Sequence, residues 1–178
     1  MTPSGGGGTW LDLDALLSRI QDTDVATAVR ENGFIFPWVE AVHVLAVTVV
    51  VGSVAVLDLR LLGWASRDRP VSRVLADVLP TTWTAFALAF LSGALLFSSN
   101  ALVYAHNPFF RSKLVLLVLL GVNTAVFHRA TARRLGEWDG APLPPRWARA
   151  AGAISIVLWI GVTICGRWVG FTRVSVPP

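Results

Sequence analysis

The stretch FPWVEAVHVLAVTVVVGSVAVLDLRLLG, residues 36–63, decides the fold of this protein. Its only ionisable side chains are Glu40 and His43 near the start and Asp58 and Arg60 near the end. Because about 20 apolar helical residues span the hydrocarbon core of a bilayer, the stretch predicts a transmembrane helix over residues 37–63. Three further segments meet the same criterion, at residues 81–102, 109–128 and 148–171.

The composition agrees with this interpretation. Of the 178 residues 54% are hydrophobic and only 15% are charged, and the mean hydropathy is +0.61, which is too apolar for a soluble domain of this size. Short connections between the spans favour an up-down arrangement. We therefore predict an all-α integral membrane four-helix bundle over residues 34–178, with Pro37, Pro80 and Pro108 at helix starts, where a missing N–H costs nothing.

The segment before the first span predicts different structure. Residues 1–11 form a glycine-rich tail that is expected to be disordered. Residues 12–33 predict two short amphipathic helices, the second with Thr23 as N-cap and an end at Asn32 and Gly33. These helices are expected either to lie at the membrane interface or to cap the bundle.

The orientation follows from the distribution of Lys and Arg. Two loops between spans carry nine arginines: Arg60, Arg67, Arg69, Arg73, Arg129, Arg133, Arg134, Arg146 and Arg149. The other side carries six basic residues: Arg19, Arg30, Arg111, Lys113, Arg167 and Arg173. The positive-inside rule makes the two loops cytoplasmic and places both termini on the outer side of a bacterial inner membrane. It also explains the net charge of +4 without nucleic acid as a partner.

Ionisable residues inside a membrane are candidates for function. The alternating helices should bring Glu40, His43, Arg111, Lys113 and Arg167 to one level near the outer surface, with His106 in the loop above. His43 and His106 could ligate a haem b or copper, and the basic residues could meet haem propionates or a quinone-like headgroup. The alternative is that the basic residues only snorkel to lipid headgroups.

A second group of polar residues lies near the inner surface: Asp58, Arg60, His128 and Arg129. Here a pair between Asp58 and either Arg129 or His128 is expected to fix that end of the bundle. Asp58 lies fifteen residues beyond His43, which corresponds to about 22 Å of depth, so the two groups form separate levels.

Several motifs resemble those of a known family. The stretch at 36–63, together with LSGALLFSSNA, NPFFRSKLVLL and ICGRWVGFT, resembles a family of small bacterial inner-membrane proteins of unknown function. In build the chain is more distantly similar to cytochrome b561 and copper-resistance D membrane modules. That resemblance implies a four-helix membrane fold. The paired haem-ligating histidines of b561-type proteins are not reproduced, because His43 and His128 lie at opposite depths.

Three hypotheses for function remain. The leading one is an outer-facing polar site that binds haem, a quinone or a metal, or that docks a redox partner. Its rival is a non-catalytic accessory or scaffold subunit of a membrane complex. Small residues four positions apart, at Ala85, Ala89 and Gly93 and at Gly166 and Gly170, predict helix-packing faces, so bulky changes at Gly93 or Gly170 would disrupt its assembly. A homo-oligomer stays open as well. The third is a proton- or ion-coupled transporter. No nucleophile elbow, P-loop, HExxH or dinucleotide fingerprint occurs in the sequence, which disfavours an enzyme.

Overall fold

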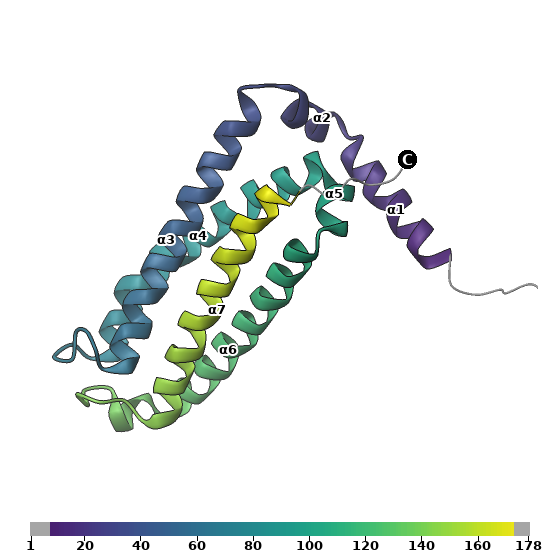
Figure 1. The fold of residues 1–178 in the computed structure, drawn as a ribbon. Coiled ribbons are helices and arrows are strands. Elements are labelled where there is room, and N and C mark those ends of the chain that lie inside the picture. Colours follow the sequence, from purple (N-terminus) through teal and green to yellow (C-terminus); the bar gives the residue numbers. More distant parts are fainter. Residues whose placement is uncertain (1–7, 173–178) are drawn as a thin grey trace, which may run out of the picture.

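A computed structural model describes residues 8–172, in which there are seven helices and no strand. The four long helices are α3 (Ile35–Leu62), α4 (Val71–Ser99), α6 (Pro108–Trp138) and α7 (Arg146–Phe171) (Figure 1). Each contains a stretch long and apolar enough to cross a membrane. The predicted all-α membrane bundle of four helices is therefore confirmed.

The three short helices gather at one end of the bundle. Helices α1 (Gly8–Gln21), α2 (Asp24–Glu31) and α5 (Ala101–His106) lie where α3 begins and α7 finishes (Figure 1). We call this the terminal end. The opposite end carries the connections 63–70 and 139–145, and we call it the loop end. Helix α1 begins at Gly8, within the residues 1–11 for which the sequence predicted a tail; residues 1–7 and Arg173 lie outside the described part of the chain.

Helix α4 begins at Val71 rather than near residue 81, so Pro80 lies inside the helix and not at its start. The start is instead fixed by Asp139, which follows α6. The Asp139 carbonyl accepts a hydrogen bond from the Val71 N–H at 3.1 Å, and its carboxylate accepts from the Ser72 N–H at 2.7 Å and hydroxyl at 2.6 Å. These bonds satisfy first-turn N–H groups that Pro70, the residue before the helix, leaves without a side-chain cap.

Helices α3 and α7 are central to the packing. Helix α3 packs against α4 on one side and α7 on the other, and α7 also packs against α6. Helices α3 and α7 approach each other closely at Gly152, where an added Cβ would lie 3.1 Å from the Asp58 carbonyl oxygen and 3.2 Å from Leu61 Cβ. A Cβ at Gly161 of α7 would lie 3.1 Å from Leu116 of α6. Small residues on α7 thus allow the backbones to approach closely, as expected in lipid.

Helices α1 and α2 pack on the bundle, which was one of the two placements expected for them. Thr23 is the N-cap of α2, as the sequence predicts, and accepts a hydrogen bond from the Ala26 N–H at 3.4 Å. The Leu102 N–H donates to the Gln21 side-chain carbonyl at 3.3 Å, and the Arg30 guanidinium donates to the Ser99 carbonyl at 3.4 Å. These bonds hold the two helices against the end of α4 and the start of α5.

Asn107 connects α6 and α7 at the terminal end. Its side-chain oxygen caps α6 by accepting from the Phe109 and Phe110 N–H groups at 2.9 and 3.3 Å. Its amide donates to the Thr172 carbonyl at 2.7 Å and hydroxyl at 3.0 Å. The side chain is buried, so no water can replace these four bonds without structural change.

We expect Asn107→Ala to lower the free energy of unfolding by about 2 kcal/mol, the upper range for loss of an N-cap. The measurement is unfolding by SDS in mixed micelles. Asn107→Asp keeps the capping oxygen but cannot donate to Thr172, and it should fall between wild type and Asn107→Ala. If the aspartate variant were as unstable as the alanine variant, capping of α6 would not be the main contribution.

The loop end has the main apolar core of the described residues. Leu61, Val71, Phe127, Trp138 and Ala148 pack together there, contributed by all four long helices. Arg60 is 0% exposed beside this core. Its Nε donates to the Arg69 carbonyl at 2.8 Å, and its Nη2 donates to the Ala141 carbonyl at 3.1 Å. One side chain of α3 therefore holds both connections of the loop end.

Candidate functional site

His43 lies on α3 against α4. Its Nδ1 is 2.9 Å from the Ala89 carbonyl oxygen and 3.1 Å from the Ser92 hydroxyl. The ring rests on Gly93, where an added Cβ would lie 2.9 Å from Cε1. Because a carbonyl only accepts, this geometry assigns the Nδ1 proton to His43 and leaves Nε2 of the neutral ring as an acceptor. The sequence predicted Gly93 on a helix-packing face, but not the role of Ser92.

Lys113 approaches the same region from α6. It is half-buried, and its Nζ lies 3.6 Å from the position that a Cβ on Gly166 of α7 would occupy. Lys113 and the exposed Glu40 both lie near enough to His43 to act electrostatically on the imidazole. Among the side chains that the structure describes, none forms a hydrogen bond or an ion pair with Lys113. Three of the predicted residues, Glu40, His43 and Lys113, therefore lie at one level of the bundle, with Glu40 and Lys113 within electrostatic range of the imidazole.

An aromatic cluster of Phe97, Tyr104 and Phe110 spans α4, α5 and α6 at the terminal end. The ring centroids lie 5.4 Å apart for Phe97 and Phe110, and 5.6 Å apart for Tyr104 and Phe110. Burial first, and the negative charge of Glu40 second, raise the pKa of Tyr104. Glu40 is therefore near enough for its charge to act on Tyr104 of this cluster, which we call the aromatic cover.

The other predicted residues of the outer level do not join this group. His106 on α5 has Nδ1 2.9 Å from the Leu102 carbonyl oxygen and Nε2 3.6 Å from the Asp14 carboxylate of α1. Arg111 is exposed, and the exposed Arg167 lies over Phe171 at 5.4 Å from the ring centroid. The proposed pairing of His43 with His106 finds no support in these contacts, because counting along helices fixes the height of a residue and not the direction it faces.

The inner group separates in the same way. Asp58 is 4% exposed and faces Ser155 and Gly152 of α7. His128 and Arg129 are exposed on α6, and within residues 8–172 neither forms an ion pair with Asp58. The pair predicted across α3 and α6 is not observed among the described residues, and α7 packs against both of these helices. Asp58 and Arg60 are buried, but they serve different contacts.

The two polar levels are separated by apolar side chains. Ala46 and Val50 of α3, Leu120 of α6 and Val162 of α7 are all buried at heights between His43 and Asp58. This layer interrupts the polar side chains that a proton path through the bundle would need.

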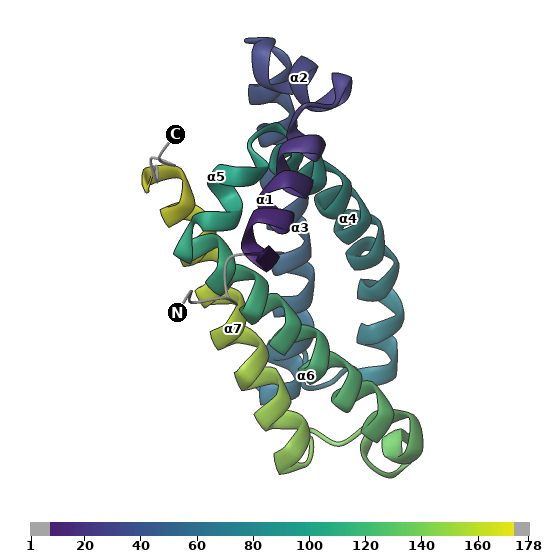
Figure 2. The same cartoon turned by 90° about the vertical axis from the view of Figure 1, so that its right-hand side faces the viewer.

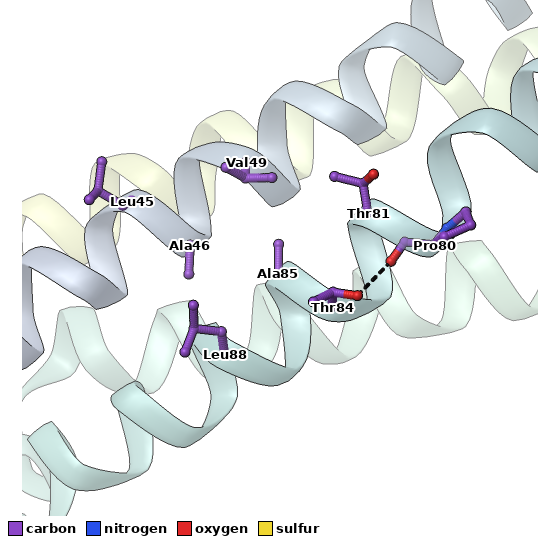
Figure 3. Close-up of a pocket in the computed structure, with 8 residues that line it drawn as sticks. All are labelled: Leu45, Ala46, Val49, Pro80, Thr81, Thr84, Ala85 and Leu88. Carbon is purple, nitrogen blue, oxygen red and sulfur yellow. Dashed lines mark hydrogen bonds between the residues drawn. The ribbon is translucent and has the colours of Figure 1, made fainter.

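A groove of about 510 Å³ lies along the seam of α3 and α4 (Figure 3). It is lined by Leu45, Ala46, Val49, Pro80, Thr81, Thr84, Ala85 and Leu88. Its only polar side chains are two threonines, and Thr84 donates its hydroxyl to the Pro80 carbonyl at 2.9 Å. The groove contains no ionisable group, and its surface suits lipid acyl chains.

The terminal-end site, which we define as His43, Ser92, Lys113 and Glu40, offers both an acceptor and donors. His43 Nε2 can accept a hydrogen bond from an O–H or N–H group, and the Lys113 ammonium can donate a hydrogen bond to an oxygen. Within residues 8–172 no three His, Cys, Asp or Glu side chains gather in a way that could hold a metal ion. The donor and the acceptor of this site could together bind a ligand that carries polar oxygens.

These features define a small polytopic membrane protein with four membrane-spanning helices and a polar site near one end. A model of the Family of unknown function (DUF6644) matches residues 28–172. The chain belongs to this family, and the resemblance to a family of unknown function is confirmed. Neither a curated protein nor a solved structure matches the sequence.

Proposed function

We propose that this protein binds a small ligand with a quinone-like headgroup at the terminal-end site. The observation that supports the proposal most is Lys113, a half-buried ammonium within a membrane-spanning helix that has no counter-ion among the described side chains. Such a charge is costly in lipid unless an acceptor stabilises it. A ligand oxygen directed at Nζ would supply that acceptor.

The adjacent imidazole makes a quinone or quinol headgroup a good match. A quinone carbonyl would accept from Lys113, whereas a quinol hydroxyl would donate to His43 Nε2. The Ala89 carbonyl and Ser92 hydroxyl hold the imidazole through Nδ1, so the ring is positioned before the ligand arrives. Pre-organisation of this kind reduces the entropy lost on binding.

The test is binding of a benzoquinone with a decyl tail to the purified protein in liposomes, followed by quenching of tryptophan fluorescence. We expect Lys113→Met to weaken binding at least about tenfold, which is the loss of ~1.4 kcal/mol. His43→Phe should weaken it to a similar degree. Arg129→Met and His128→Phe, at exposed positions of the loop end, are the matched controls and should bind as wild type does. No saturable quenching of the wild-type protein would contradict the proposal.

Haem or copper ligated by His43 is an alternative ligand for the same site, and a different measurement tests it. A reduced-minus-oxidised spectrum and metal analysis of protein purified in mild detergent would test it. Absence of a Soret band and of stoichiometric iron or copper would remove this version and leave the quinone-like ligand unaffected.

We also propose that the terminal end faces the outer side of a bacterial plasma membrane. The nine arginines of the loop end support this orientation. Labelling of a single cysteine placed at Arg133, in a Cys165→Ser background, would test it. If a membrane-impermeant reagent modified this cysteine from outside intact cells, the proposed orientation would be wrong.

An accessory subunit is the second proposal, and one observation favours it. Helix α6 leaves a row of large apolar side chains exposed: Leu114, Val115, Val118, Leu119, Val122 and Val126. A partner helix could pack its own apolar face on this row. A redox partner protein or a second copy of the chain that co-purifies through this row, and is lost in Val118→Arg, would support this alternative.

A further inference from the structure

Contacts join α4 and α6 near both ends of the two helices. At the loop end the Asp139 carboxylate binds Ser72 at 2.6 and 2.7 Å, so the end of α6 holds the start of α4. At the terminal end the Phe97 and Phe110 rings stack with centroids 5.4 Å apart. Between these two points α4 and α6 are not among the closely packed helix pairs, and Figure 2 shows the two helices apart over most of their length.

The face of α6 that carries Lys113 is covered in part, because Lys113 lies against Gly166 of α7 while residues further along the same face are exposed. Thr124 lies eleven residues after Lys113, about three helical turns, so both residues share one face. Lys113 is half-buried near His43, whereas Thr124 is exposed. The α4 side of the bundle exposes Phe86 and Phe90, at 43% and 67%. At mid-depth the residues Phe86 and Phe90 of α4 and Thr124 of α6 are therefore exposed to the bilayer rather than packed between the helices.

Packing covers part of the other approaches to the site. Helix α5 and the aromatic cover bridge α4 and α6 at the terminal end, and α1 packs on α5. Two apolar grooves lie along the seam of α3 with α4, and one of them is lined by Ser92, but the His43 ring fills the space over Gly93. Small residues bring α7 close to α3 at Gly152 and to α6 at Gly161. Helices α4 and α6 lack such close packing between the contacts at their two ends.

We propose that the ligand of the terminal-end site is a lipid-soluble molecule that enters from the bilayer between α4 and α6. Its head carries acceptor oxygens for Lys113, and its apolar tail remains in the gap or in the surrounding lipid. This inference rests on the proposed function, because it names the class of ligand and the route to the same site. A ligand of this class need not cross the aromatic cover.

The test places a bulky side chain in the gap. In Thr124→Phe we expect the association and dissociation rate constants of the decyl-tailed benzoquinone both to fall about tenfold, a barrier higher by ~1.4 kcal/mol. The dissociation constant should stay unchanged, because a plug alters the route and not the site. Val122→Phe is the matched control on the opposite face of α6; its residue is already 56% exposed, and its rates should equal those of wild type.

The same benzoquinone without its tail tests the class of ligand. We expect it to bind at least about tenfold more weakly in total concentration, because the tail concentrates the probe in the bilayer. Equal binding of the two probes would overturn the lipid-soluble class. Equal rates in Thr124→Phe and Val122→Phe would overturn the route while the proposed function stands. If neither probe binds to wild type, the proposed function and this inference both fail.

Discussion

Replacing Gly152 with leucine is expected to lower the free energy of unfolding by about 3 kcal/mol, because overpacking of this kind forces backbones apart. Even a single Cβ at Gly152 would lie 3.1 Å from the Asp58 carbonyl oxygen and 3.2 Å from Leu61 Cβ. The nearest atom belongs to a helical backbone and cannot rotate away. The larger leucine side chain must therefore separate α7 from α3. Unfolding by SDS in mixed micelles measures the loss.

Gly170→Leu is the matched control for this prediction. Gly170 is in the same helix, but nothing lies within 4 Å of a Cβ added there. We expect its effect on stability to stay within about 0.5 kcal/mol, as at other exposed positions. Equal destabilisation by the two leucines would mean that the contact between α3 and α7 does not set the cost, since leucine favours a helix more than glycine does.

The membrane fold could be predicted from the sequence because it depends on a quantity that local sequence carries. A span needs a run of apolar residues of sufficient length, and segments such as 36–63 show that run directly. Spacing of small residues also identified the face of α4 that bears Ala85 and Gly93, which packs against α3. The same spacing cannot distinguish Gly170, which has no close neighbour, from a tightly packed glycine, because the distinction depends on how close a neighbouring helix lies.

Helix boundaries depended on contacts distant in sequence. Pro80 was placed at a helix start because proline suits the first turn, whereas α4 begins at Val71. The residue that stabilises this start is Asp139, which no local motif connects to Ser72. Boundaries fixed by caps within a few residues, such as Thr23 of α2, were predictable.

The candidate site was predicted in part. Depth along each helix can be counted, and this count brought Glu40, His43 and Lys113 to one level. Which residues face one another depends on the rotation of each helix about its axis, which the count does not give. His106 therefore lies beside Asp14 of α1 and not beside His43. Ser92 gave no distinctive signal, because a serine in a transmembrane helix usually donates to its own backbone, and its contact with His43 follows only from packing.

Replacing Arg60 with methionine is expected to cost about 3 kcal/mol of unfolding free energy, because hydrogen bonds from a charged group contribute roughly 1.5–3 kcal/mol each. The guanidinium donates to the Arg69 and Ala141 carbonyls at 2.8 and 3.1 Å and thereby connects two loops. Asp139 and Asp68 lie near its charge. Loss of Arg60 therefore also removes the cation beside the carboxylate that caps α4.

Arg129→Met and Arg60→Lys separate the possible causes of such a loss. Arg129 is exposed near the same end, so Arg129→Met removes one positive charge without a buried contact and should stay within about 0.5 kcal/mol of wild type. Arg60→Lys keeps the charge, but a single ammonium lacks the fork geometry that reaches two carbonyls at once. We expect the lysine variant to recover less than half of the loss. Full recovery by lysine would show that charge near the membrane surface, rather than the bridge between the two loops, accounts for the stabilisation.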